Sequence, residues 1–161
     1  MKVFTAPEKI ESSRLPNLFL AGSIEMGKAD NWQDIVIDSY KDLDICILNP
    51  RRKHWDNSLE QSINNPVFKE QVVWELDGLD SARFVMVYLQ PKTYSPISLL
   101  EIGLYCKSTD KILVVCCPDG FYRKGNVQIV CKRFGIPLVD DFGHLIAEMR
   151  KLMIYDGVKT V

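Results

Sequence analysis

The 161 residues suffice for one domain with a sizeable core, and 47% hydrophobic against 25% charged residues is ordinary for a water-soluble globular protein. A formal net charge of −1 gives no reason to expect a nucleic-acid polymer or a membrane as partner, and no hydrophobic run approaches the roughly 20 residues of a membrane-spanning helix. The N-terminus lacks the hydrophobic core of a signal peptide, and the five cysteines follow no metal-ligand spacing. We therefore expect a cytoplasmic protein whose cysteines are buried free thiols.

The first third of the chain predicts two strands around a helix. Residues 1–16 are a loop or a short edge strand, and 17–22 (NLFLAG) form a buried strand. Glycines at 22 and 27 in the loop that follows can bring backbone N–H groups close to a ligand, although this signal alone is weak. Asp30 is predicted to cap a helix, and residues 45–48 form the next strand. The hydrophobic positions of that helix are Trp32, Ile35, Val36, Tyr40 and Leu43.

A basic segment follows this strand. It contains Arg51, Arg52, Lys53 and His54, the densest basic cluster in the chain. One interpretation is a solvated loop. The other is a clamp for a phosphate or carboxylate, because arginine suits both anions.

The next helix is predicted to begin at Asn65 and Pro66. Glu75 lies on it beside Trp74, either as an edge residue or as a site group with a raised pKa. The predicted core face of the helix consists of Phe68, Val72, Leu76 and Leu79.

The stretch 94–107 lies between two hydrophobic runs, 83–89 and 111–117, and predicts the helix of a βαβ unit. Ser95 is the expected N-cap, with Pro96 in the first helical position. A stripe of Ile97, Leu100 and Leu104 is expected to pack on the sheet, with a second stripe of Ser98, Glu101 and Tyr105 beside it. Position alone leaves two interpretations of Glu101: an acid near a helix N-terminus, favoured by the helix dipole, or a site group.

The last third predicts a short helix over 127–134, capped by Asn126 and closed by Gly135. A strand at 136–139 and a final helix that begins at Asp140 or Asp141 complete the chain. The alternation of strands and helices indicates a single doubly wound α/β domain over 1–161, flavodoxin-like or Rossmann-like, with about five parallel strands.

Four segments give this chain a resemblance to the nucleoside 2-deoxyribosyltransferases and, within that superfamily, to the deoxyribosyltransferase-like branch. They are FLAGSI (19–24), NPRR (49–52), QVVWELDGLDSA (71–82) and SPISLLEIGLY (95–105). Each motif is moderately specific, but their order and spacing together are hard to reach by chance. The resemblance implies cleavage or transfer of the N-glycosidic bond of a (deoxy)nucleoside or its 5′-monophosphate, without a metal or redox cofactor.

The resemblance also implies roles for individual residues. Glu101 matches the nucleophile that attacks the anomeric carbon, and Glu75 matches an acid, usually aspartate, that protonates the leaving base or orients the nucleophile. Ser95 falls where transferases have a second aspartate and nucleotide hydrolases a serine. Asn126 matches an asparagine donated to a neighbouring subunit, which implies a homodimer or higher oligomer with shared sites. The predicted substrate-binding residues are Phe19, Gly22, Ser23, Ile24, Arg51, Arg52, Trp55, Ser95, Ser98 and Asn126.

Three positions depart from the family pattern. Leu18 and Phe19 stand where the family often has a tyrosine that touches the nucleophile, and Glu25 replaces a basic residue that hydrolases use near a 5′-phosphate. Glu75 is one methylene longer than the usual aspartate. These departures bear on substrate class, and they keep open an alternative in which the protein binds a nucleotide-like ligand without turnover.

Overall fold

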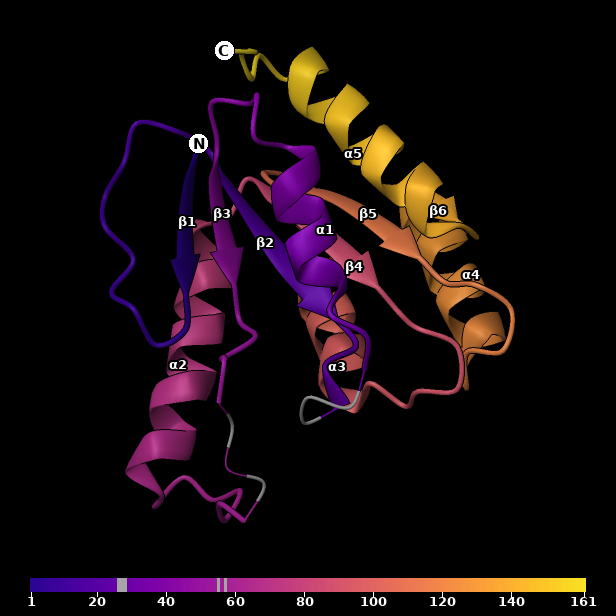
Figure 1. Ribbon diagram of the computed structural model, residues 1–161. Coiled ribbons are helices and arrows are strands. Elements are labelled where there is room, and N and C mark those ends of the chain that lie inside the picture. Colours follow the sequence, from indigo (N-terminus) through magenta and orange to yellow (C-terminus); the bar gives the residue numbers. More distant parts are fainter. Residues whose placement is uncertain (26–28, 55, 57) are drawn as a thin grey trace.

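The computed structural model describes residues 1–25, 29–54, 56 and 58–161 (Figure 1). Its strands form one parallel sheet in the order β1-β3-β2-β4-β5-β6. They are β1 (Lys2–Thr5), β2 (Asn17–Gly22), β3 (Cys46–Asn49), β4 (Phe84–Tyr88), β5 (Ile112–Cys116) and β6 (Leu138–Val139). The helices are α1 (Trp32–Ser39), α2 (Pro66–Ser81), α3 (Pro96–Tyr105), α4 (Lys124–Phe134) and α5 (Phe142–Tyr155).

Helices cover both faces of this sheet. One core cluster joins α1 and α5 to one face, and a second joins α2, α3 and α4 to the other, as Figure 1 shows. The predicted doubly wound α/β fold class is therefore confirmed. The sheet has six strands instead of about five, since β1 in the N-terminal lead-in pairs with β3 at the edge.

The chain reverses direction across the sheet between β2 and β4. From β2 it passes through α1 to β3 on one side, and from β4 it passes through α3 to β5 on the other. Connections that leave two neighbouring parallel strands in opposite directions open a crevice at the strands' carboxyl ends, where α/β proteins bind ligands. The segments after β2 and β4 meet at this crevice.

Several predicted helix ends are confirmed. The side chain of Asn65 accepts hydrogen bonds from the backbone N–H groups of Val67 and Phe68, and that of Asp141 accepts one from His144. Gly135 adopts the left-handed conformation after α4, with φ 68°. The sequence therefore located these boundaries from cap chemistry alone.

Two other predicted caps are wrong. Helix α1 begins after Asn31 rather than at Asp30, and the Asn31 amide hydrogen-bonds the Asp34 carboxylate instead of capping the backbone. Asn126 is not a cap, because α4 already begins at Lys124.

The predicted packing face of α3 is wrong in phase, and that of α2 is confirmed only in part. Ile97, Leu100 and Leu104 are 59%, 59% and 54% exposed, while Ser98, Glu101 and Ile102 of α3 are buried. In α2 Leu79 is buried as predicted and Phe68 and Val72 are half-buried, whereas Leu76 is exposed. The other buried residues of α2 are Gln71, Trp74 and Gly78. In both helices the inward face thus includes polar side chains.

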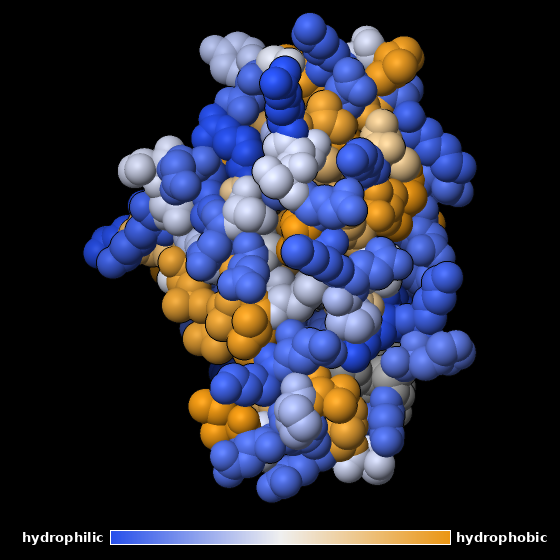
Figure 2. Space-filling model, turned by 90° about the vertical axis from the view of Figure 1, so that its left-hand side faces the viewer, coloured by the Kyte–Doolittle hydropathy of each residue, from blue (hydrophilic) through white to orange (hydrophobic). Residues whose placement is uncertain are grey.

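The remaining surface features are unexceptional. Figure 2 shows the side that carries β1 and α2, where hydrophobic residues gather in separate patches among hydrophilic ones. Four cysteines are buried as expected, whereas Cys106 is partly exposed. In the described ranges no helix combines the length and the hydrophobicity needed to cross a bilayer.

Candidate active site

Glu101 lies on the inward face of α3 and is 9% exposed. Ser95, Ser98 and Glu101 recur every three residues, so they lie along one side of the helix, and all three are buried. Within the described part of the chain, only burial and the charge of Glu75 act on the Glu101 carboxyl, and no hydrogen bond holds it. This carboxylate is therefore unsatisfied by the protein and open to a ligand.

The second carboxylate, Glu75, is oriented by a glutamine. The Nε2 group of Gln71 donates to Glu75 Oε1 at 2.7 Å and to the backbone carbonyl of Pro50 at 2.9 Å. The Oε1 atom of Gln71 accepts a hydrogen bond from Arg52 Nε, and Arg52 also pairs with Glu70. The buried Gln71 amide thus has a partner on each side, which fixes the direction in which Glu75 points.

The two carboxyl groups interact. Burial, and then the negative charge of Glu75, raises the pKa of Glu101 to about 8. Burial also raises the pKa of Glu75, against the opposing effects of the Gln71 hydrogen bond and the Arg52 charge. At neutral pH the raised pKa of Glu101 therefore favours one proton on the pair, held by Glu101 beside the ionised Glu75.

A cluster of hydroxyl groups ties the segment after β2 to the one after β4. The Oγ of Ser23 accepts from the backbone N–H of Gln90 at 2.8 Å and lies 2.6 Å from Ser95 Oγ and 2.9 Å from Thr93 Oγ1. The Gln90 side chain exchanges two hydrogen bonds with the backbone of Asp30. Ser23 is fully buried, so its position indicates support of the crevice.

Gly22 permits the close approach of the two strands. A Cβ at this position would lie 2.2 Å from the carbonyl oxygen of Tyr88, and its φ is +137°. Only glycine fits both conditions. The next residue but one, Ile24, is half-buried in the loop that follows.

Glu25 lies at the N-terminus of α3, a position that the sequence did not suggest. Its Oε1 accepts from the backbone N–H groups of Ser95 at 2.8 Å and Tyr94 at 3.2 Å. Ser95 occupies the N-cap position as predicted, but its side chain makes no cap bond. The Glu25 carboxylate instead holds the two backbone N–H groups that directly precede the helix.

The other predicted binding residues are spread over several parts of the structure. Arg51 donates to the backbone carbonyls of Ala29 and Asp30, and so connects the basic segment to the start of α1. Phe19 is fully buried, with its ring beside that of Trp74. Trp55 lies outside the described residues.

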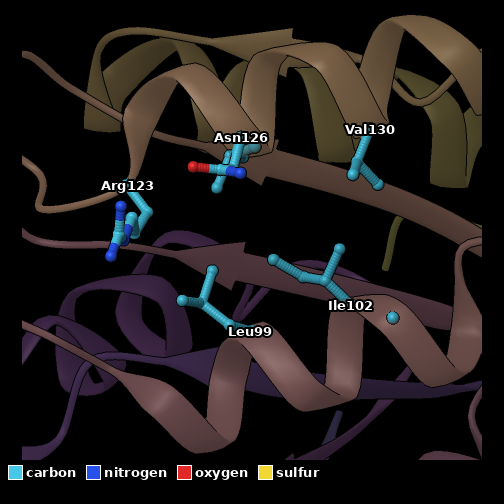
Figure 3. Close-up of a pocket in the computed structure, with 7 residues that line it drawn as sticks. Leu99, Ile102, Arg123, Asn126 and Val130 are labelled. Atoms are coloured by element: carbon cyan, nitrogen blue, oxygen red, sulfur yellow. The ribbon is translucent and has the colours of Figure 1, made fainter.

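Asn126 lies in a different place from the Glu75–Glu101 pair of its own chain. It lines a cavity of about 310 Å³ between α3 and α4, and it is exposed. Figure 3 shows Asn126 and Val130 of α4, and Arg123 just before it, facing Leu99 and Ile102 of α3 across this space. Glu101 belongs to the neighbouring side of α3, toward α2.

Sequence reasoning missed Gln71 and Gln90 as parts of the site, and it named Glu25 near a 5′-phosphate without its contact to the start of α3. For Gln71 a signal existed, because residues four apart on a helix are neighbours and Gln71 precedes Glu75 by four. Gln90 and Glu25 act on groups 60 to 70 positions away, and no local pattern announces such contacts.

The sequence of this chain matches a known protein family, and its fold is similar to that of a solved structure. A family model described as nucleoside 2-deoxyribosyltransferase like matches residues 15–121. A solved structure of a conserved protein from Enterococcus faecalis V583 is similar, with a TM-score of 0.57 and 10% identity over 85% of this chain and 98% of the other. At that identity it supports the fold alone. No curated protein matches the sequence.

Proposed function

Because the chain belongs to the nucleoside 2-deoxyribosyltransferase-like family, we propose that it cleaves or transfers the N-glycosidic bond of a nucleoside or nucleoside 5′-monophosphate. The observation that carries the proposal is the electrostatic coupling of two carboxyls, that of buried Glu101 and that of half-buried Glu75. Both lie on the helices that cover one face of the sheet.

The proposed reaction starts once the proton of the pair has passed from Glu101 to Glu75. Ionised Glu101 then attacks the anomeric carbon while protonated Glu75 gives its proton to the departing base. The C–N bond breaks, its electron pair leaves with the base, and a sugar–Glu101 ester forms. Water or a second base then attacks the anomeric carbon and releases Glu101 as carboxylate, and Glu75 recovers a proton from the incoming nucleophile.

The hydrogen bonds around Glu75 suit this role. Gln71 donates to Oε1, so the carboxyl proton belongs on Oε2, the oxygen that Gln71 leaves free. Glu101 needs no such donor before the reaction, because positive charge that develops on the sugar stabilises its ionised form.

We further propose that the active unit is a homo-oligomer in which Asn126 completes the site of a neighbouring subunit. Two observations support it: Asn126 faces the α3–α4 cavity rather than its own carboxylate pair, and the outward side of α3 exposes Ile97, Leu100 and Leu104. A partner that covers this side would exclude water from a covalent intermediate.

The second candidate is a module that binds a nucleotide-like ligand without turnover. The observation in its favour is Phe19, which is buried in the core and offers no hydroxyl group to Glu101.

A single assay separates these candidates. The protein is incubated with a panel of nucleosides and nucleoside 5′-monophosphates, with and without a free acceptor base, and base release is followed by chromatography. Intact-mass spectrometry during turnover should reveal a species heavier by one sugar residue, absent from Glu101→Gln. Ligand-induced thermal stabilisation without any base release would favour the binding module and contradict the enzyme.

A further inference from the structure

The carboxylate of Glu25 lies at the start of α3, where it can affect which substrates bind. We propose that Glu25 is a specificity-determining residue that selects nucleosides with a free 5′-hydroxyl and rejects nucleoside 5′-monophosphates. This inference rests on the proposed function and narrows it.

Glu25 fills a place that suits an anion. Backbone N–H groups at a helix N-terminus bind phosphates and carboxylates, and here those of Tyr94 and Ser95 already bind Glu25 Oε1. A 5′-phosphate that approached α3 from this side would meet a carboxylate instead of free donors, and like charges at such distances repel strongly.

Glu25 also lies on the side of the site toward which the sugar of a bound nucleoside can extend. Ser95 lies six residues before Glu101 on the same buried side of α3, which corresponds to roughly 9 Å along the helix, with Ser98 between them. In a furanose the carbon that bears C5′ lies across the ring oxygen from the anomeric carbon. A sugar with its anomeric carbon at Glu101 can therefore extend its 5′ end past Ser98 toward Glu25.

The hydroxyl groups of Ser23 and Ser95 connect Gln90 to Glu25. Ser23 Oγ accepts from Gln90, and its own proton can go to Ser95 Oγ or to Thr93 Oγ1. The Ser95 hydroxyl can in turn donate to Glu25 Oε1 at 3.4 Å. Every proton in this chain then has an acceptor. The contact forms although Glu25 and Ser95 both adopt positive φ, 48° and 41°, which costs non-glycine residues energy.

The second oxygen of Glu25 remains available. Among the described residues, the hydrogen bonds to this carboxylate all go to Oε1. Oε2 can thus accept the proton of a 5′-hydroxyl, whereas a phosphate at neutral pH brings only negatively charged acceptors.

Binding measurements test the proposal directly. On a Glu101→Gln background, which holds ligand without turnover, calorimetry compares a nucleoside with its 5′-monophosphate. We expect the nucleoside to bind at least about tenfold tighter, and Glu25→Gln to lower that ratio about tenfold or more. Glu25→Gln keeps an oxygen acceptor for the α3 backbone, and Glu148→Gln on α5 provides the same change of charge on the other face of the sheet and should leave the ratio unchanged.

The outcomes separate the two proposals. An unchanged ratio in Glu25→Gln, a monophosphate preferred by the protein with Glu25, or no binding of either ligand overturns the role of Glu25. Base release from nucleosides and monophosphates at equal kcat/KM also overturns it, while it supports the proposed function. No base release from any substrate overturns the proposed function, and the binding ratio still decides the role of Glu25. Should Glu25→Gln fail to fold, Glu25→Asp should fold and keep the nucleoside preference, and a loss of that preference in Glu25→Asp would contradict the proposal.

Discussion

The two faces of the sheet are covered by helices of opposite design. Helices α1 and α5 bury a conventional core, with Trp32, Val36, Leu145 and Met149 against the strands. Helix α3 on the other face points polar side chains inward and leaves large hydrophobic ones in solvent. Both designs rest on the same sheet.

This difference distinguishes the layer that stabilises the fold from the layer that carries the candidate site. Burial of hydrophobic side chains stabilises the α1–α5 layer, whereas a buried carboxylate without a hydrogen bond costs stability in the α3 layer. Such a local conflict with the rules of folding is expected at a functional site. The exposed stripe on α3 is in turn the kind of surface that a partner covers.

The largest effect is expected at the inward side of α3. Replacing Glu101 by glutamine removes the proposed nucleophile and should lower the rate of base release by more than about a thousandfold, because an amide cannot form the sugar ester. Steady-state assays with a responsive substrate measure this. Wild-type turnover by Glu101→Gln would contradict the assignment of the nucleophile.

The same variant should change how stability depends on pH. The pKa of Glu101 is about 8 in the folded protein and near 4.5 when unfolded, so the folded state binds more protons between these values. Stability from this group is present below about pH 4.5 and is lost as pH rises through 8. Glu101→Gln should therefore be more stable than the wild type at pH 8.5, on the order of a few kcal/mol, and similar to it at pH 4. Parallel urea titrations at both pH values provide the measurement, and an equal difference at the two would argue against a raised pKa.

The outward side of α3 gives the next prediction. Leu100→Glu places a charge in the exposed stripe and should dissociate the proposed oligomer, with a loss of activity of about tenfold or more. The monomer's own stability should change by less than about 0.5 kcal/mol, since the side chain is already 59% exposed. Ile35→Glu on α1 is the matched control, because Ile35 is 53% exposed on the opposite face. Light scattering and activity are measured together.

Mixing two inactive variants tests whether the sites are shared. Glu101→Ala and Asn126→Ala protein, combined and allowed to exchange subunits, should regain activity because some sites receive an intact residue from each parent. A wild-type protein that is active as a monomer would contradict the shared site, and with it the expected results for Leu100→Glu and for the mixed variants.

Gln71 on α2 should have a smaller but distinct effect. Gln71→Met removes the donor to Glu75 and leaves the Pro50 carbonyl without its partner, so we expect a loss of about 1–3 kcal/mol in stability. Base release should fall about ten- to a hundredfold, with the pH optimum shifted upward because the hydrogen bond lowers the pKa of Glu75. Chemical denaturation and a pH–rate profile separate these effects. A drop in stability with an unchanged pH profile would make Gln71 a purely structural residue.

Some of these features could be predicted from the sequence, and others could not. Strand and helix order and the Asn65 and Asp141 caps followed from local patterns, and motifs made Glu101 a candidate site residue. The phase of α3 did not, because its hydrophobic residues predicted an inward stripe that the buried Ser98 and Glu101 displaced. Glu25 and Ser95 are 70 positions apart, and only the fold brings them together.

The smallest effect concerns a second buried glutamine, on the conventional face. Gln33 of α1 is fully buried, and among the described residues neither its Nε2 nor its Oε1 has a hydrogen-bond partner. Such a group lowers stability, and replacing it by an unbranched hydrophobic side chain of similar length removes the cost. Gln33→Met should therefore raise the free energy of unfolding by about 1 kcal/mol, the opposite sign from Gln71→Met in the polar layer. Urea unfolding of both variants measures the pair. If Gln33→Met instead destabilises the protein, the amide is satisfied in solution, and the contrast between the two faces does not extend to their buried glutamines.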